Sequence, residues 1–209
     1  MLEYETKAVV LDKKTIGEFD AQIVLYTELM GKIELVARGL KKPTAKLSHH
    51  LEPLNLINAT LIAVSHKHLT SALTINRFPD LRRNPEALTI ALKNLKILKE
   101  AVVSPEKDEL LWRNLTDFLE NLEKFSRNEN ALFIQAAGLH FLLQLAQRLG
   151  VLPDSFEDWP FKTEAKVQKI VVQLLSRDSP EKIDLKIFDG IKYSQVEEPL
   201  KKIIITSSV

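Results

Sequence analysis

The 209-residue chain contains no cysteine, which excludes disulfide bonds, thiolate nucleophiles, iron–sulfur clusters and cysteine-ligated zinc. Its apolar runs fall well short of the ~18 residues that would cross a bilayer, and no apolar signal core follows Met1. Charges nearly cancel, with 29 Lys and Arg against 28 Asp and Glu, so the net charge indicates no nucleic-acid, membrane or acidic partner. We therefore expect a soluble, unprocessed chain, with which a reducing, cytoplasmic environment is compatible.

Residues 1–78 show the two-residue period of β-strands. Ile33, Leu35 and Ala37 alternate with other residues, so one strand face should meet a core and the other solvent or a ligand. That second face carries Lys32, Glu34, Val36 and Arg38. Five strands are predicted, near residues 7–11, 21–27, 33–37, 54–64 and 69–78. Five short strands with a long third connection are typical of a small closed barrel.

From residue 79 onward the apolar period changes to 3.6, which predicts helices. Asn84-Pro85-Glu86 and Ser104-Pro105-Glu106 each supply an N-cap, a proline at the first helical position and an acid in the first turn. Further helices are predicted from about 130 to 149, stopped by Gly150, and from 163 to 175, with a short element opened by Ser179. The fold class is therefore α+β, with a barrel domain at 1–78 and a helical domain at 79–209.

Two details of the helical part depend on the spacing of apolar residues. The first long helix is predicted to bury one stripe of leucines, Leu88, Leu92, Leu95 and Leu98. The last residues, 199–209, fit a helix and a strand equally well.

Basic residues gather in the third connection although the whole chain is nearly neutral. Between Leu35 and Pro79 a single acid, Glu52, stands against Arg38, Lys41, Lys42, Lys46, Lys67 and Arg77. Residues 38–46 are predicted to be a strand end that runs into a mobile loop, and Lys13 and Lys14 to lie in the first inter-strand loop. Such cations bind phosphates by releasing counterions, and a small barrel is a common platform for single strands. A merely solvated basic loop explains the same charges.

Few residues are candidates for catalysis or metal binding. Glu18 and Asp20 are better explained as fixing a turn than as an acid–base pair, and His66 and His68 lack a nearby third ligand. His140 lies among apolar residues, as core histidines do. Phosphate-binding glycine loops, serine nucleophile elbows and His-Glu metal helices are absent from the sequence. We therefore predict no catalytic residue, no metal site and no cofactor, in a protein that is not an enzyme.

Four short blocks follow one another at nearly fixed spacing. They are Gly17-Glu18-Phe19-Asp20, Thr27 with Gly31, Ala37-Arg38-Gly39 followed by Lys41-Lys42-Pro43, and Leu51-Glu52-Pro53. Their order resembles the N-terminal domain of the bacterial RecO family of DNA repair proteins, which are recombination mediators. The resemblance covers residues 17–53, and the helical remainder is similar to the family's C-terminal domain more loosely.

This resemblance implies an oligonucleotide-binding (OB) barrel followed by a helical domain. It implies a protein of the bacterial nucleoid that binds single- and double-stranded DNA, anneals complementary strands and helps RecR load RecA onto DNA coated with single-strand binding protein (SSB). The acidic SSB tail would bind an apolar pocket, edged by bases, in the helical domain. Phosphates would be held by Arg38, Lys41, Lys42 and Lys46, with Lys13 and Lys14 as a second contact. Many relatives bind zinc through four cysteines, and because residues 155–160 contain none, the fold is expected to be zinc-free.

Two other classes of protein fit the same sequence. One is a protein-only adaptor with an OB-like barrel, in which the basic loop is only solvated. The other is an RNA-binding factor of the translation machinery. The salt dependence of DNA binding separates a mediator from an adaptor. A preference between DNA and RNA separates it from a translation factor, since only RNA carries the 2′-hydroxyl.

Overall fold

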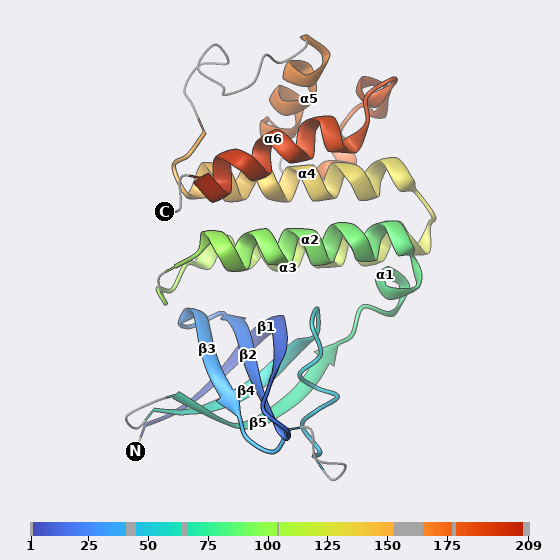
Figure 1. Cartoon of the computed structure of the whole chain (residues 1–209). Coiled ribbons are helices and arrows are strands. Elements are labelled where there is room, and N and C mark those ends of the chain that lie inside the picture. Colours follow the sequence, from blue (N-terminus) through green and yellow to red (C-terminus); the bar gives the residue numbers. More distant parts are fainter. Residues whose placement is uncertain are drawn as a thin grey trace. The chain divides into compact units, whose positions relative to one another are not determined.

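The computed structural model describes residues 2–40, 45–63, 67–103, 105–152, 165–176 and 179–206. The chain forms two compact units (Figure 1), one of Met1–Phe78 with Val102–Trp112 and one of Pro79–Ala101 with Arg113–Val209. Strands come first and helices follow, so the predicted α+β class with an N-terminal barrel is confirmed. The domain limits of 1–78 and 79–209 stay a prediction, because compactness does not test independent folding.

The first unit is built on one antiparallel sheet of five strands. They are β1 (Leu2–Ile16), β2 (Asp20–Thr27), β3 (Gly31–Ala37), β4 (Leu56–Ala63) and β5 (Lys67–Asn76), in the order β3-β2-β1-β4-β5. The two outer strands, β3 and β5, also approach each other, so the sheet curls into a barrel. Its interior is filled by alternate residues of the strands, among them Val10, Ile23, Leu25, Ile33, Leu35, Ile57 and Leu61.

Strand β1 is longer than the predicted 7–11, and the prediction that Lys13 and Lys14 lie in a loop is wrong. Both residues are in β1, where Lys13 pairs with Ile23 and Lys14 with Gln22 of β2. The apolar alternation breaks at the register shift between Val10 and Asp12, so the sequence pattern hides the second half of the strand. Backbone pairing with β2 nevertheless continues as far as Ile16.

The third connection is packed against the barrel over much of its described length. After β3 ends at Ala37, residues 38–40 form a turn, and residues 41–44 of the predicted loop lie outside the described part. Leu51 and Leu54 are fully buried. The side-chain amide of Asn55 donates to the backbone oxygens of His49 (3.1 Å) and His50 (2.9 Å). Burial of Leu51 in the barrel core and the backbone bonds of Val10 in β1 with Leu54 and Asn55 hold the end of this connection on the barrel.

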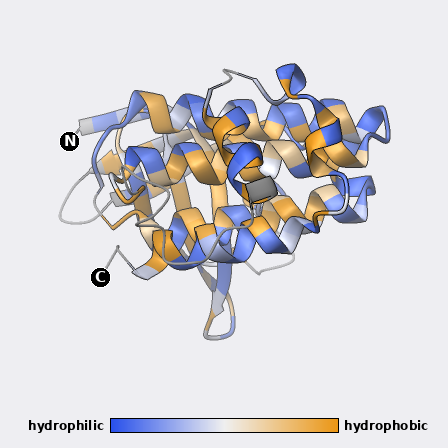
Figure 2. Ribbon diagram, turned by 90° about the horizontal axis from the view of Figure 1, so that it is seen from above, coloured by the Kyte–Doolittle hydropathy of each residue, from blue (hydrophilic) through white to orange (hydrophobic). Residues whose placement is uncertain are grey.

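The second unit is helical. Its elements are α1 (Pro79–Arg83), α2 (Pro85–Ala101), α3 (Glu109–Arg127, of which 109–112 belong to the first unit), α4 (Ala131–Arg148), α5 (Ala165–Leu175), the 3-10 helices η2 (Pro180–Lys182) and η3 (Leu185–Phe188), and α6 (Tyr193–Thr206). Helix α4 packs against α2, α5 and α6, which explains why it is buried on most sides. Figure 2 shows apolar and polar residues alternating along the helices. In the described part of the chain, no helix combines the length and apolarity needed to cross a membrane.

The observed first residues of the helices can be compared with the capping residues that the sequence predicted. The Asn84 side chain accepts from the backbone amides of Glu86 and Ala87, both at 3.1 Å, so the predicted start of α2 is confirmed. The predicted limits of α4 are also confirmed, by the cap at Asn130 and by Gly150 at φ 68°. The predicted start at residues 104–106 is wrong, because α3 begins at Glu109 with Asp108 as its cap.

Two further helical predictions are settled by the packing. Leu92 is 44% exposed, so its place in the buried stripe was wrong, and Ile90, Ala91 and Asn94 lie on the buried face instead. The ambiguous C-terminal segment is helical as far as Thr206, although Pro199 stands inside α6.

A small polar cluster lies within this helical unit. The Asn94 amide donates to the backbone oxygen of Gly138 (2.9 Å), and the nearly inaccessible Glu197 carboxylate accepts from Lys93 (3.3 Å). The buried Tyr193 hydroxyl has no hydrogen-bond partner among the described residues. Burial, and then the negative charges of Glu197 and Glu86, raise the pKa of Tyr193 well above its ordinary value.

This raised pKa predicts a loss of stability at alkaline pH. Below pH 10 the Tyr193 hydroxyl is protonated in both the folded and the unfolded protein, so it adds no pH dependence. As the pH rises from there toward the folded pKa, the unfolded tyrosine ionises while the folded one stays protonated, so the free energy of unfolding falls. We expect thermal melts at pH 9 and pH 11 to show a larger fall in Tm for the wild type than for Tyr193→Phe. Equal falls in the two proteins would contradict the assignment.

Candidate nucleic-acid interface

The outer face of β3 is formed by the residues that alternate with its core residues. Leu35 is 4% exposed whereas its neighbour Val36 is 48% exposed, as the two-residue period predicts. Lys32 and Glu34 share the face of Val36, and exposed Arg38 follows the strand end. Between Lys32 and Arg38 the chain covers about 20 Å.

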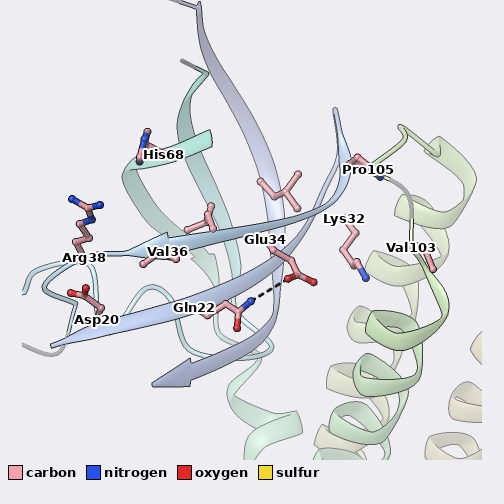
Figure 3. Close-up of a pocket in the computed structure, with 11 residues that line it drawn as sticks. Asp20, Gln22, Lys32, Glu34, Val36, Arg38, His68, Val103 and Pro105 are labelled. Carbon is pink, nitrogen blue, oxygen red and sulfur yellow. Dashed lines mark hydrogen bonds between the residues drawn. The ribbon is translucent and has the colours of Figure 1, made fainter. Parts of the chain in front are cut away.

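An open cavity of about 950 Å³ lies over this face. It is lined by Asp20, Gln22, Lys32, Ile33, Glu34, Leu35, Val36, Arg38, His68, Val103 and Pro105, all of which belong to the first unit. In Figure 3, Arg38 and His68 lie toward one end of the cavity, and Lys32 lies toward the other end with Val103 and Pro105. The Gln22 amide donates to the Glu34 carboxylate (3.2 Å) between the two ends.

Opposite charges share this cavity. Asp20 accepts the backbone amide of Gly39 (2.8 Å), so this carboxylate holds the turn that carries Arg38, as the sequence suggested. The Glu34 carboxylate takes part in the hydrogen bond with Gln22. The cavity therefore has a cation toward each end, with the Asp20 carboxylate beside Arg38 and the Gln22–Glu34 pair in between. Two separated cations suit a ligand with separated anionic groups and polar edges.

Among the predicted DNA-binding residues, the structure places only Arg38 in the cavity, and Lys41 and Lys42 lie outside the described residues. Lys14 and Lys46 are exposed elsewhere on the same unit. The Lys13 ammonium lies 2.7 Å from the Glu52 carboxylate and donates to the backbone oxygen of Ser48 (3.1 Å). Lys13 thus fastens the third connection to β1. A role in DNA binding stays a prediction for all six residues.

The histidines in the described part of the chain show no metal-ligating arrangement. His68 lines the cavity, and His66 lies outside the described residues. The ring of His50 accepts the backbone amide of Thr74 (3.0 Å), and burial, with smaller effects of His49 and Arg77, lowers its pKa. Across the described ranges, no three potential ligands come together around a metal-sized space. The segment of the relatives' zinc site, 155–160, is not described.

Sequence reasoning did not propose most of the cavity residues as a site. The alternation of β3 indicated the face that carries Lys32, Glu34 and Val36, without assigning it a ligand. Gln22 and His68 face the same space from β2 and β5, which only the barrel brings together. Nothing in the local sequence marks Val103 and Pro105 as part of a site. They lie about 70 residues after β3 in the chain, and only folding brings them to the cavity.

The helical unit holds a smaller cavity of about 230 Å³ between α3, α4 and η2. Carboxylates, amides and the buried His140 line much of it, and Phe118 and Phe141 stack at 4.6 Å beside them. Among the described residues that line it there is no Lys or Arg. This cavity does not match the apolar, base-edged pocket expected for an acidic SSB tail, so the place of that pocket stays a prediction.

The curled five-stranded sheet and the ligand-sized cavity over β2 and β3 define an OB-fold protein, a class that uses this face and the adjoining loops for oligonucleotides. Residues 1–76 match the family model described as Recombination protein O N terminal. The first 76 residues are thus similar to the N-terminal domain of the RecO family of DNA repair proteins, in agreement with the resemblance of the four sequence blocks.

Comparisons with whole proteins agree. The chain is 27% identical over 154 residues to DNA repair protein RecO of Synechococcus sp. (strain JA-2-3B'a(2-13)), covering 68% of this chain and 54% of that protein. It is 26% identical over 149 residues to RecO of Exiguobacterium sp. (strain ATCC BAA-1283 / AT1b), covering 69% and 56%. RecO of Dehalococcoides mccartyi (strain ATCC BAA-2100 / JCM 16839 / KCTC 5957 / BAV1) is 28% identical over 131 residues, covering 62% and 52%. The chain spans about half the length of these curated relatives.

Proposed function

We propose that this chain is a non-catalytic recombination mediator that binds single- and double-stranded DNA and anneals complementary strands. The observation that carries the proposal is the cavity with cationic ends on the β2–β3 face of a barrel that matches the RecO family. In proteins of this fold, that face is the usual one for nucleic acids.

The geometry supports a strand laid along β3. Arg38 and Lys32 lie near opposite ends of the cavity, where each can hold a phosphate. Gln22 and Glu34, between them, present hydrogen-bonding groups to base edges. Annealing needs no bond-making chemistry, because it requires only neutralised phosphates and bases left free to pair.

The proposal extends to partners and place of action. The mediator acts with RecR to load RecA onto SSB-coated DNA in the bacterial cytoplasm, and it binds the SSB tail through the helical part. Support for this comes from the similarity to proteins named DNA repair protein RecO. Because the whole chain lacks cysteine, the mediator works without the four-cysteine zinc site of many relatives.

Salt-dependent DNA binding tests the proposal. We expect fluorescence anisotropy with labelled single-stranded DNA to give an affinity that falls steeply with salt. Replacing Arg38 and Lys32, the two cations that line the cavity, by Ala should lower the slope of log K against log salt by about 0.7 for each phosphate that the variant no longer neutralises. Affinity should fall at least about tenfold at moderate salt.

Matched controls make that result specific. Lys169→Ala and Lys202→Ala remove exposed charges from α5 and α6 and should leave affinity and slope unchanged. An equal loss in these controls would show that net charge, and not the barrel face, governs binding. Wild type that fails to bind at low salt would point to the protein-only adaptor. Tighter binding to RNA of the same sequence would favour the translation factor.

A further inference from the structure

We infer that the connection between α2 and α3 completes the nucleic-acid site, with Val103 and Pro105 forming an apolar wall for an unpaired base. The inference rests on the proposed function and names the part of the site that distinguishes single strands from duplex. Both residues line the cavity over β3, although the barrel strands end at Asn76. Figure 3 shows them at the Lys32 end of the cavity.

The wall presents apolar surface to water. Val103 is 72% exposed, more than any other large apolar side chain in the described ranges. Pro105 is exposed beside it. An isolated exposed valine needs no explanation, but one at the rim of a ligand-sized cavity supplies the apolar contact that such sites use.

The wall is held in place by the turn between β2 and β3. Gly31 adopts a φ of +63°, and a Cβ added there would overlap the backbone oxygen of Glu106 and lie 2.9 Å from its carbonyl carbon. The Thr27 hydroxyl donates to the Gly31 backbone oxygen (2.9 Å) and accepts the Met30 amide (3.0 Å), which fixes the turn. The segment beside Pro105 therefore packs directly on backbone, and its position follows that of β3.

This arrangement favours a strand whose bases are unstacked. The Lys32 ammonium near the wall suits a phosphate, while Val103 and Pro105 suit the apolar face of the base attached to it. In a duplex the base faces are covered by their neighbours, so a duplex gains the phosphate contact without the wall. The wall should thus add affinity for single strands and leave duplex binding unchanged.

Substitution of Val103 tests the wall in the full chain. Val103→Ser should weaken single-stranded DNA binding by about threefold to tenfold, the lower range for one base contact, without changing the salt slope. Duplex affinity should stay the same. Val103→Phe, which enlarges the wall with an aromatic ring, should strengthen single-strand binding. Because Val103 is exposed, neither change should alter the melting curve.

Leu73→Ser is the matched control, since Leu73 is 61% exposed on β5 of the same unit and does not line the cavity. If the wild type binds DNA in a salt-dependent way and Val103→Ser binds single strands equally well, the inference of an apolar wall is wrong and the proposed function still stands. Equal losses for single strands and duplex, or for Leu73→Ser, overturn it as well. If the wild type binds no DNA, both the proposed function and the inference of the wall are wrong.

Discussion

Gly31→Ala should lower the free energy of unfolding by about 3 kcal/mol or more, which corresponds to a fall in Tm of at least about 6 °C. One part of the cost is the left-handed backbone, since φ is +63° and alanine there costs about 1 kcal/mol. The larger part is the overlap of the new methyl group with the backbone of Glu106, which cannot rotate away as a side chain would. Urea or thermal unfolding followed by circular dichroism measures the loss.

Gly17→Ala separates these two contributions. Gly17 has nearly the same φ, +62°, in the hairpin between β1 and β2, but no atom lies within 4 Å of an added Cβ. It should therefore lose only the backbone term, about 1 kcal/mol. If the two variants lose equal stability, the close packing of Glu106 on the β2–β3 turn is not present in solution.

Gly138→Ala should destabilise the helical unit by about 2 kcal/mol, even though alanine is the better helix former by about 1 kcal/mol. The added Cβ would lie 2.6 Å from a methyl group of Ile90 and 2.7 Å from the Tyr193 hydroxyl. Helices α2, α4 and α6 meet at this glycine and Ile90 is 4% exposed, so its side chain has little room to move away. Thermal unfolding of the purified variant tests the sign of the change.

Tyr193→Phe provides the matched second change. It removes the oxygen that the new methyl group would meet, and this oxygen has no hydrogen-bond partner in the described structure. Alone it should be neutral or slightly stabilising, and it should recover at least about 0.5 kcal/mol of the loss in the double variant. Gly150 has a φ of +68° and no atom within 4 Å of an added Cβ, so the loss of stability in Gly150→Ala measures the cost of backbone strain alone. Strictly additive changes would contradict direct contact between Gly138 and Tyr193.

Local rules predicted those parts of the fold in which local interactions decide the outcome. The alternation around Ile33 and Leu35 placed β3 and its two faces, because one face of the strand is buried. Asn84 marked the start of α2, because its side chain bonds amides only two and three residues away. The resemblance over residues 17–53 added the barrel topology and the DNA repair family.

Long-range contacts decided the parts that the sequence did not reveal. The start signal at residues 104–106 failed because Glu106 packs on the Gly31 turn, which leaves Asp108 to cap α3. From the sequence Lys13 is expected to be a solvated cation. The folded third connection instead places Glu52 and Ser48 around its ammonium group. The cavity was missed for the same reason, because Val103 joins a site whose other members lie on the barrel strands and in the turns that follow them.

The chain passes from one compact unit to the other three times, after Phe78, Ala101 and Trp112. This order affects how the protein folds during synthesis. A ribosome releases all five strands before α2, but residues 102–112, which the first unit also needs, follow only after this helix. When they emerge, α2 still lacks α4 and α6, the helices that it contacts in its own unit. At roughly 5 to 20 residues per second, about 2 to 7 seconds pass between the release of Trp112 and that of Arg148 at the end of α4. The nascent chain therefore finishes its barrel while it exposes an apolar helix face, a stage at which a chaperone would bind it.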